Sequence, residues 1–352
     1  MRQNVCPVAR VGRCMAAPVL AAALACGALV TGPAVAGSVA RAGATSLVKG
    51  ACAARSLSGA VTLELTLKIV KSGPVRVPMV AVCVDRKGPY HFLVSTGAGS
   101  SVISPALVRS LHLKKGVRVP VRGVTCITSA PTVAVKNWSM AGLKLAAQHL
   151  VVANIPRDGL SPAPKGIIGS DLLARFRAVG IDYFTSRLFL LEGEGAAPKG
   201  NVYVLGQSKA SPPPTLVKGS LKLDSVLRVF ESPQGTIVAA PVKIGGHTEQ
   251  LAVDSGSPTS GLLPSIGSSL KLLAGSRKVT YAGIGCKGKA AVFSSGGWAL
   301  GGSVLPAASL VSRPIAGTIN AGLEGVIGAD VISHDGGVIV DYAGAHLWLT
   351  SG

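Results

Sequence analysis

The sequence predicts an all-β protein in which one lobe occurs twice. Hydrophobic residues make up 48% of the 352 residues and charged residues only 14%, so the chain can bury two cores and is not globally disordered. Short apolar runs rich in Val and Thr, separated by glycine, are typical of β-strands. A set of motifs that returns at one fixed spacing predicts the duplication.

The N-terminus is typical of an export signal. Three arginines precede an apolar run: Arg2, Arg10 and Arg13. The run is alanine-rich and covers residues 15–30, and Ala34-Val35-Ala36 after it fits a signal-peptidase site. We therefore expect a signal peptide at 1–36, an N-terminal segment at 37–60 and a periplasmic or secreted mature protein.

A lipoprotein is the rival interpretation of this region. Leu24-Ala25-Cys26-Gly27 loosely resembles a lipoprotein motif, which would place a lipid on Cys26. Residues 15–30 are few for a transmembrane span, so we expect membrane attachment only if Cys26 carries that lipid.

The charge is strongly basic, with 35 Lys and Arg against 15 Asp and Glu. Such an excess can indicate a nucleic-acid partner. Here the cations are scattered and are not interleaved with aromatic side chains that could stack on bases. We expect no nucleic-acid partner and interpret the charge as a surface property, with an acidic outer compartment as one hypothesis.

Three pairs of motifs recur 159 residues apart: Ser95 with Asp254, Gly166 with Gly325, and Asp182 with Asp341. Three coincidences at one offset indicate a duplicated domain. We expect a first lobe at 61–193 and a second at 220–352. The segment 194–219 between them contains Pro212-Pro213-Pro214 and is the natural linker.

The elements follow from alternation and turn residues. Residues 61–70 alternate apolar and polar side chains, as a half-buried strand does. Each copy then predicts a hairpin: strands 77–84 and 90–94 around 85–88, and strands 236–244 and 249–253 around 245–246. Short helices are expected at 106–111 and 171–176, and a strand at 220–229 that matches the one at 61–70.

The repeated turn carries recognisable chemistry. A strand that ends in Asp-Ser/Thr-Gly presents a carboxylate on a tight turn, where glycine permits close approach of another chain. Two such turns face to face place two carboxyl groups together, and these share one proton. One carboxylate can then activate water while its protonated partner polarises a peptide carbonyl.

On these motifs the chain resembles the retropepsin-like aspartic proteases, in the two-repeat form of bacterial exported proteins. The resemblance implies two β-barrel lobes related by a pseudo-twofold axis, with a hairpin flap over the cleft between them. It implies a threaded apolar-apolar-Gly motif, which Ile168 and Gly169 match in the first copy and Ile327 and Gly328 in the second. A peptide or protein substrate in the interlobe cleft, and no cofactor, are also implied.

The two turns differ at one position. The second copy has Asp254-Ser255-Gly256, whereas the first has Ser95-Thr96-Gly97. Asp254 is the candidate catalytic acid and Ser95 the degenerate position opposite it. One hypothesis is an aspartic endopeptidase, weakly active through Asp254 or active as a dimer of two second lobes; we expect a monomer. The alternative is a pseudoenzyme that binds peptides or an envelope partner.

Other acids have structural interpretations. Asp171, Asp330, Asp182 and Asp341 occur in both copies, so we expect them to cap helices or form turns.

Four cysteines remain after the signal: Cys52, Cys83, Cys126 and Cys286. An even number in an exported chain predicts two disulfides, and the absence of a Cys/His cluster argues against a metal site. Cys126 lies 31 residues after Ser95 and Cys286 lies 32 after Asp254, where the resemblance implies the flap. We therefore predict a Cys126–Cys286 bridge across the flaps and a Cys52–Cys83 bridge; the alternative is buried thiols.

Overall fold

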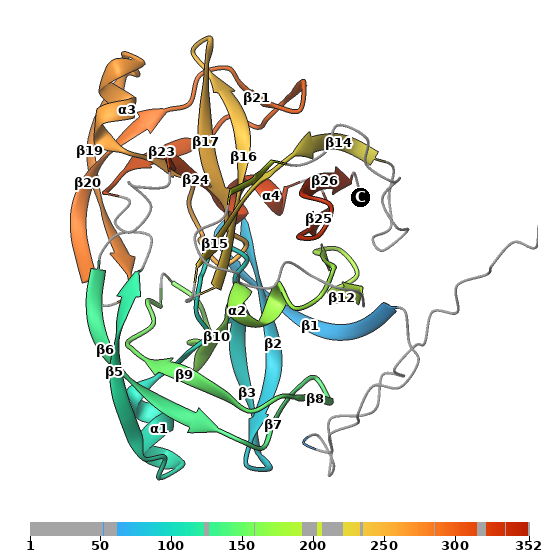
Figure 1. Cartoon of the computed structure of the whole chain (residues 1–352). Helices are drawn as coiled ribbons and strands as arrows, with labels where there is room; N and C mark the ends of the chain where they lie inside the picture. Colours follow the sequence, from blue (N-terminus) through green and yellow to red (C-terminus); the bar gives the residue numbers. More distant parts are fainter. Residues whose placement is uncertain are drawn as a thin grey trace, which may run out of the picture. The chain divides into compact units, whose positions relative to one another are not determined.

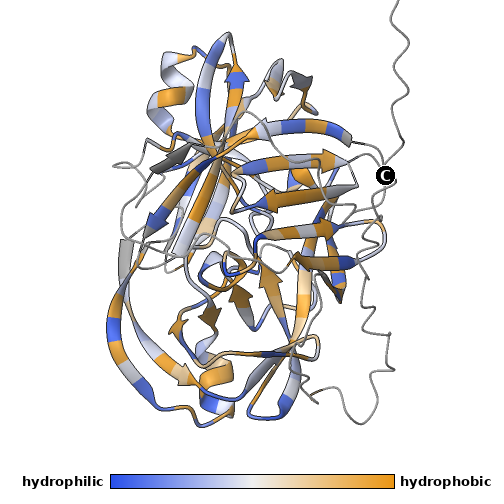
Figure 2. Cartoon of the chain, turned by 45° about the vertical axis from the view of Figure 1, so that its right-hand side comes forward, coloured by the Kyte–Doolittle hydropathy of each residue, from blue (hydrophilic) through white to orange (hydrophobic). Residues whose placement is uncertain are grey.

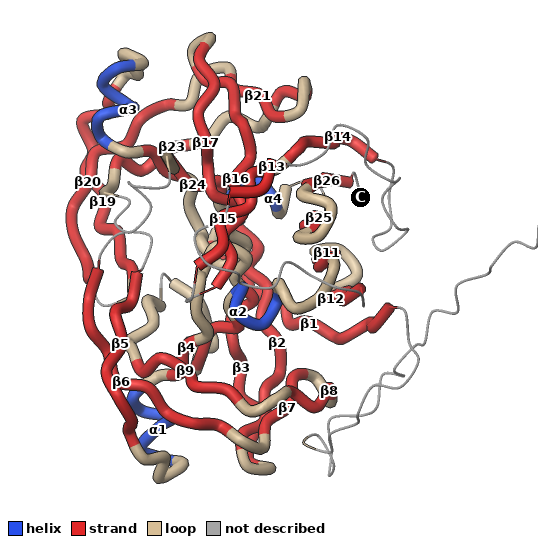
Figure 3. The backbone as a smooth tube through the Cα atoms, in the orientation of Figure 1, coloured by secondary structure: helices blue, strands red, loops and turns tan. Residues whose placement is uncertain are grey.

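The structure is a computed structural model, which describes Cys52 and residues 62–122, 127–157, 159–191, 203–205, 221–232, 235–284, 286–314, 322–334 and 336–350. Strands dominate these residues and the helices are short, as Figure 3 shows. The strands form one sheet of fifteen and another of eleven. The predicted all-β class with two lobes and short helices is confirmed.

The first copy contains twelve strands and two helices in chain order. They are β1 (Thr62–Ser72), β2 (Val75–Val84), β3 (Lys87–Val94), β4 (Val102–Ile103), α1 (Pro105–Ser110), β5 (Lys115–Arg122), β6 (Ile127–Val135), β7 (Trp138–Met140), β8 (Leu143–Leu145), β9 (Gln148–Val152), β10 (Gly166–Ile168), α2 (Ser170–Leu173), β11 (Ala178–Asp182) and β12 (Arg187–Leu191).

The second copy repeats this order. Its elements are β14 (Leu221–Val226), β15 (Arg228–Ser232), β16 (Gly235–Ile244), β17 (His247–Val253), β18 (Gly261–Leu262), α3 (Pro264–Ser269), β19 (Ala274–Gly283), β20 (Cys286–Ser294), β21 (Trp298–Leu300), β22 (Ser303–Val304), β23 (Ser309–Ser312), β24 (Gly325–Ile327), α4 (Ala329–Ile332), β25 (Gly337–Asp341) and β26 (His346–Thr350).

Three elements differ from the sequence expectations. The single strand expected at 220–229 is two strands, β14 and β15, which break at Leu227, whereas β1 runs unbroken in the first copy. The helix expected at 171–176 ends at Leu173. A short strand, β13 (Tyr203–Leu205), lies inside the proposed linker and pairs with β15.

The central hairpins form because their turns accept positive φ. In the first copy Asp85 and Arg86 have φ values of 49° and 61°, and in the second Gly245 and Gly246 have 57° and 87°. Two consecutive residues of positive φ give the turn whose twist matches that of a hairpin. Each hairpin therefore delivers its second strand, β3 or β17, to the end where the repeated turn begins.

A layer of six strands, in the order β14-β26-β25-β11-β12-β1, runs through both copies (Figure 1). At its centre β11 pairs antiparallel with β25, and Gly180 lies opposite Ile339. These two residues are equivalent positions of the repeat, 159 apart. A pair of equivalent residues lies on the axis of a twofold arrangement. The two lobes are therefore related by a pseudo-twofold axis at this pair.

One face of this layer supports the core. Val179, Ile181 and Val340 belong to the largest apolar cluster, which extends through both copies. The opposite face carries a small cluster around Ala178, Ile339 and Trp348. Alternation of side chains between the two faces of a strand explains this division. Figure 2 shows the corresponding alternation of apolar and polar residues along many strands.

Each copy also packs its second long strand against a short helix of the other copy. The backbone N–H of Thr236 in β16 donates to Ser170 Oγ at the start of α2, at 3.1 Å. The equivalent strand β2 donates from Arg76 N–H to Ser333 Oγ beside α4, at 3.3 Å. A Cβ at Gly235 would lie 1.8 Å from the carbonyl oxygen of Gly99, so only glycine fits this crossing.

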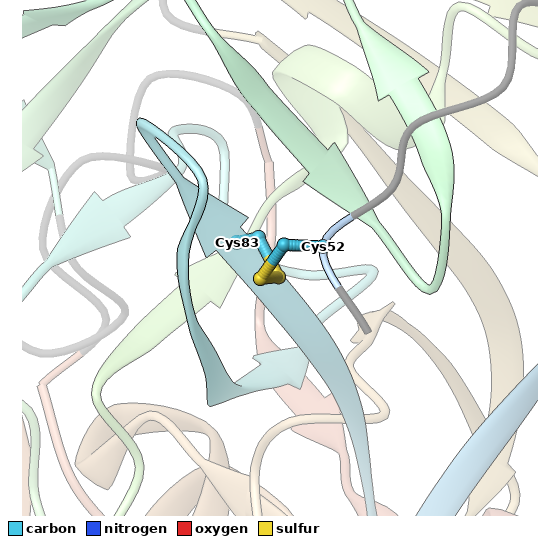
Figure 4. The surroundings of a disulfide bond; sticks show 2 residues. All are labelled: Cys52 and Cys83. Carbon is cyan, nitrogen blue, oxygen red and sulfur yellow. A yellow bond between two sulfur atoms is a disulfide. The ribbon is translucent and has the colours of Figure 1, made fainter. Parts of the chain in front are cut away.

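Cys52 and Cys83 form a disulfide with their Cα atoms 5.5 Å apart, which ties residue 52 to the end of β2 (Figure 4). Cys126 and the side chain of Cys286 lie outside the described residues, so the second predicted bridge stays a prediction. The proposed signal peptide and Cys26 also lie outside them. Among the described residues, no helix has the length and hydropathy that a membrane span requires.

Candidate active site

The two repeated turns are held by the threaded strands. Strand β10 lies between β3, which it pairs in parallel, and β4, which it pairs antiparallel; β24 lies between β17 and β18 in the same way. The N–H of Ser95 donates to Ile168 O, and that of Asp254 to Ile327 O, each at 3.0 Å. The threaded motif therefore fixes the first residue of each turn.

The turns clasp one another through Thr96 and Ser255. The backbone N–H of Thr96 donates to Ser255 Oγ at 3.2 Å, and that of Ser255 donates to Thr96 Oγ1 at 3.1 Å. Each hydroxyl then donates across the axis, Thr96 Oγ1 to Val253 O and Ser255 Oγ to Val94 O, both at 2.8 Å. Both side chains are fully buried. These four bonds hold the two copies in register at the site.

Glycine follows in both turns because the partner turn lies too close for a side chain. A Cβ at Gly97 would lie 2.5 Å from Asp254 Cβ, and one at Gly256 would lie 2.6 Å from Ser95 Cβ. The glycines therefore allow residues 95 and 254 to approach each other.

Ser95 and Asp254 meet at the centre. Ser95 Oγ donates to Asp254 Oδ1 at 2.7 Å, and the N–H of Gly256 donates to the same oxygen at 2.9 Å. A longer bond of 3.4 Å comes from Gly97 N–H, so all three donors converge on Oδ1. The N–H of Ala98 donates to Ser95 Oγ at 3.1 Å. Both residues are buried, at 4% and 5% exposed.

Residues 80–172 match the family model of the aspartyl proteases. The matched segment begins in β2 and ends in α2, so it includes the Ser95 turn and the threaded strand β10. It is retropepsin-like, as the motifs predicted. The Asp254 turn lies beyond the matched segment; the repeat and the clasp of the two turns link it to the first copy. A search of curated proteins finds no match to the chain.

Two equivalent tyrosines lie near this aspartyl-protease-like centre. Burial raises the pKa of Tyr183 and of Tyr342, and the negative charge of Asp254 raises both further. Among the described residues, neither hydroxyl has a hydrogen-bond partner. Sequence reasoning used Ile181-Asp182-Tyr183 and its counterpart only to define the repeat. Their fixed spacing was the signal that the two tyrosines occupy equivalent places.

Serine and aspartate brace each threaded glycine. Ser101 Oγ donates to Asp171 Oδ1 at 2.6 Å and accepts the N–H of Gly169 at 3.0 Å. In the second copy Ser260 Oγ donates to Asp330 Oδ1 at 2.7 Å and accepts the N–H of Gly328 at 2.9 Å. Sequence reasoning missed the two serines. The offset of 159 would have identified them, because Ser101 and Ser260 are also equivalent.

The remaining repeated acids form turns. Asp182 Oδ1 accepts the N–H groups of Phe184 and Thr185 at 2.9 and 2.8 Å, and Asp341 Oδ1 accepts that of Gly344 at 2.7 Å. No group of three or more His, Cys, Asp or Glu side chains among the described residues is arranged to hold a metal ion.

The two bracing carboxyl groups give a pH prediction. Partial burial raises the pKa of Asp171 and of Asp330 above the ordinary value of 3.8, against the lowering effect of their serine hydrogen bonds. An acid whose pKa is raised by folding contributes stability that is present below its unfolded pKa and lost as the pH rises through the folded pKa. The free energy of unfolding should therefore fall as the pH rises from about 4 toward neutrality.

Urea unfolding at several pH values measures this slope. Replacing both acids, Asp171→Asn with Asp330→Asn, should flatten it, because the amides do not titrate. The Asn side chains keep an oxygen for Ser101 and Ser260. Equal slopes for the wild type and the double variant would show that these carboxyl groups do not govern the pH dependence.

Proposed function

We propose that the chain is an exported aspartic-type endopeptidase that works with one carboxylate at its centre. The observation that carries the proposal is the 2.7 Å hydrogen bond from Ser95 Oγ to Asp254 Oδ1, between turns that clasp each other as equivalent halves of one site. The family match to residues 80–172 supports a protease-like activity.

Asp254 acts in this proposal as the general base. Its Oδ1 is occupied by Ser95 Oγ and the N–H of Gly256, so Oδ2 is the oxygen that accepts a proton from water. The hydroxide oxygen bonds to the carbonyl carbon of the peptide while the carbonyl electrons move to oxygen. When the C–N bond breaks, the proton held by Asp254 passes to the leaving amine.

Ser95 limits the rate of this reaction. A hydroxyl has a single proton, and the bond to Asp254 uses it, so Ser95 cannot also donate to the substrate carbonyl oxygen. In a carboxyl pair the protonated partner makes that donation, which stabilises the developing oxyanion. We therefore expect slow hydrolysis.

Export and quaternary state belong to the same proposal. The arginines and apolar run of residues 1–36 support secretion to a periplasmic or extracellular space, with lipidation of Cys26 as the alternative. One chain supplies both turns, which supports a monomer with a peptide or protein substrate between the lobes.

Peptide hydrolysis by the mature protein, followed from acidic to neutral pH, tests the proposal with Asp254→Asn as the variant. The amide keeps the shape and hydrogen bonds of Asp254 but cannot accept a proton from water, so cleavage should fall to the rate without enzyme. Ser257→Ala, one residue beyond the turn, is the control and should retain cleavage. A folded wild type that cleaves none of a mixed peptide library favours the pseudoenzyme instead.

A further inference from the structure

The chain between each turn and its threaded strand is rich in cations and lacks carboxylates. No Asp or Glu occurs between Asp254 and Glu324, nor between Asp85 and Asp158. In the second of these segments the cations are Lys271, Arg277, Lys278, Lys287, Lys289 and Arg313. Most of them belong to, or directly precede, the hairpin formed by β19 and β20.

Three lysines of this hairpin share one face. Thr280 lies opposite Lys289 and Ala282 opposite Lys287, and Lys278 is two residues before Thr280 on the same strand. Directly opposed residues, and residues two apart, point to the same side of a β-ribbon. Lys278, Lys287 and Lys289 therefore lie together; we call them the lysine face.

The lysine face is exposed and its charges are not neutralised. All three side chains are exposed, and the opposite face, with Val279, Tyr281 and Ala290, is less exposed. The ion pairs within the described residues, Arg187 with Glu64 and His346 with Asp224, do not involve these lysines.

The hairpin extends from the second copy to the site. Ile284, at its tip, packs against the apolar cluster of Val102, Val121 and Ile167 from the first copy, and Ala98 packs against the same cluster. Ala98 follows the Ser95 turn directly. Since Lys287 is only one pair from the end of the ribbon, the lysine face begins beside the entrance to this centre.

We propose that the lysine face binds acidic segments of polypeptide substrates and so directs them to the site, an inference that rests on the proposed function. Unneutralised charges beside a cleft attract the oppositely charged partner and orient it. The other members of the face are Thr280, Ala282 and Ala291, so it lacks the aromatic side chains that stack on nucleic-acid bases. It also lacks the large apolar side chains that insert into a lipid surface.

Binding of a fluorescent peptide tests the proposal without requiring catalysis. The protein carries Asp254→Asn, and the probe is an apolar core flanked by glutamates, compared with the same peptide in which glutamine replaces each glutamate. We expect tighter binding of the acidic peptide, weakened by salt. The variant Lys278→Glu/Lys287→Glu/Lys289→Glu should raise its Kd by about tenfold or more.

A matched variant separates a local effect from net charge. Lys68→Glu/Lys144→Glu/Lys243→Glu changes the charge equally at three exposed lysines outside the hairpin. It should change the Kd by less than about twofold. Equal weakening by both triple variants, or equal binding of the two peptides, overturns the proposal. Tighter binding of single-stranded DNA or phosphatidylglycerol vesicles than of the acidic peptide also overturns it. If the wild type cleaves nothing but the lysine face still selects the acidic peptide, the proposed function fails and acidic-segment binding stands.

Discussion

Ser95→Asp is expected to increase peptide hydrolysis by about 10²- to 10⁴-fold, the range that a positioned acid–base group contributes. The change places a second carboxyl group where Ser95 Oγ now lies 2.7 Å from Asp254 Oδ1. Two carboxyl groups at that separation share a proton, so one activates water while the other donates to the substrate carbonyl. The rate should be greatest at acidic pH and fall toward neutrality as the shared proton is lost.

The first turn already has a donor for the new carboxylate. The N–H of Gly256 donates to Asp254 at 2.9 Å, and the N–H of Gly97 is its equivalent in the other copy. Initial rates of peptide cleavage measure the effect, with Ser95→Asn as a control of similar shape that cannot donate as a carboxylic acid. If the Ser95→Asp protein folds but cleaves no faster than the wild type, the first copy has lost more than one acid.

Thr96→Val is expected to lower the free energy of unfolding by about 2–5 kcal/mol. Thr96 Oγ1 accepts the N–H of Ser255 at 3.1 Å and donates to Val253 O at 2.8 Å. Valine fills the same volume but leaves both backbone groups without these partners in a buried place. The loss therefore comes from two unmade hydrogen bonds and not from a cavity.

Urea denaturation measures this loss, and Thr132→Val is the control. Thr132 is also buried, but its Oγ1 donates to Val117 O within the first copy, at 3.0 Å. Its loss should cost about 1 kcal/mol. Adding Ser255→Ala to Thr96→Val should cost less than the sum of the single changes, because the two hydroxyls belong to one network. A Thr96→Val protein as stable as Thr132→Val would contradict a clasp at this place.

Local signals predicted the strands well because alternation and turn residues act within a few positions. The hairpin of β2 and β3, the helix α1 and the threaded strand β10 lie close to their expected places. The repeat also predicted that Ser95 and Asp254 face each other, since equivalent turns meet across a twofold axis. Here the spacing of motifs carried long-range information that single segments lack.

Other features depend on contacts between distant residues. The break at Leu227 separates the part of the strand that pairs with β26 from the part that pairs with β16, and neither partner is near in sequence. The pairing of β11 with β25 unites the copies in one layer, yet both segments read as ordinary apolar strands. Gly235 could not be singled out, because its need for glycine comes from the carbonyl of Gly99 in the other copy.

The covalent linkage of the two copies has a genetic consequence. If the lobe existed as a separate chain that paired with its own copy, one codon change from Asp to Ser would remove both acids of the site. In a fused gene the same change affects one half, as at Ser95, while Asp254 is encoded independently. The clasp through Thr96 and Ser255 still assembles the mismatched halves. Duplication thus allows selection to alter the two sides of one site separately.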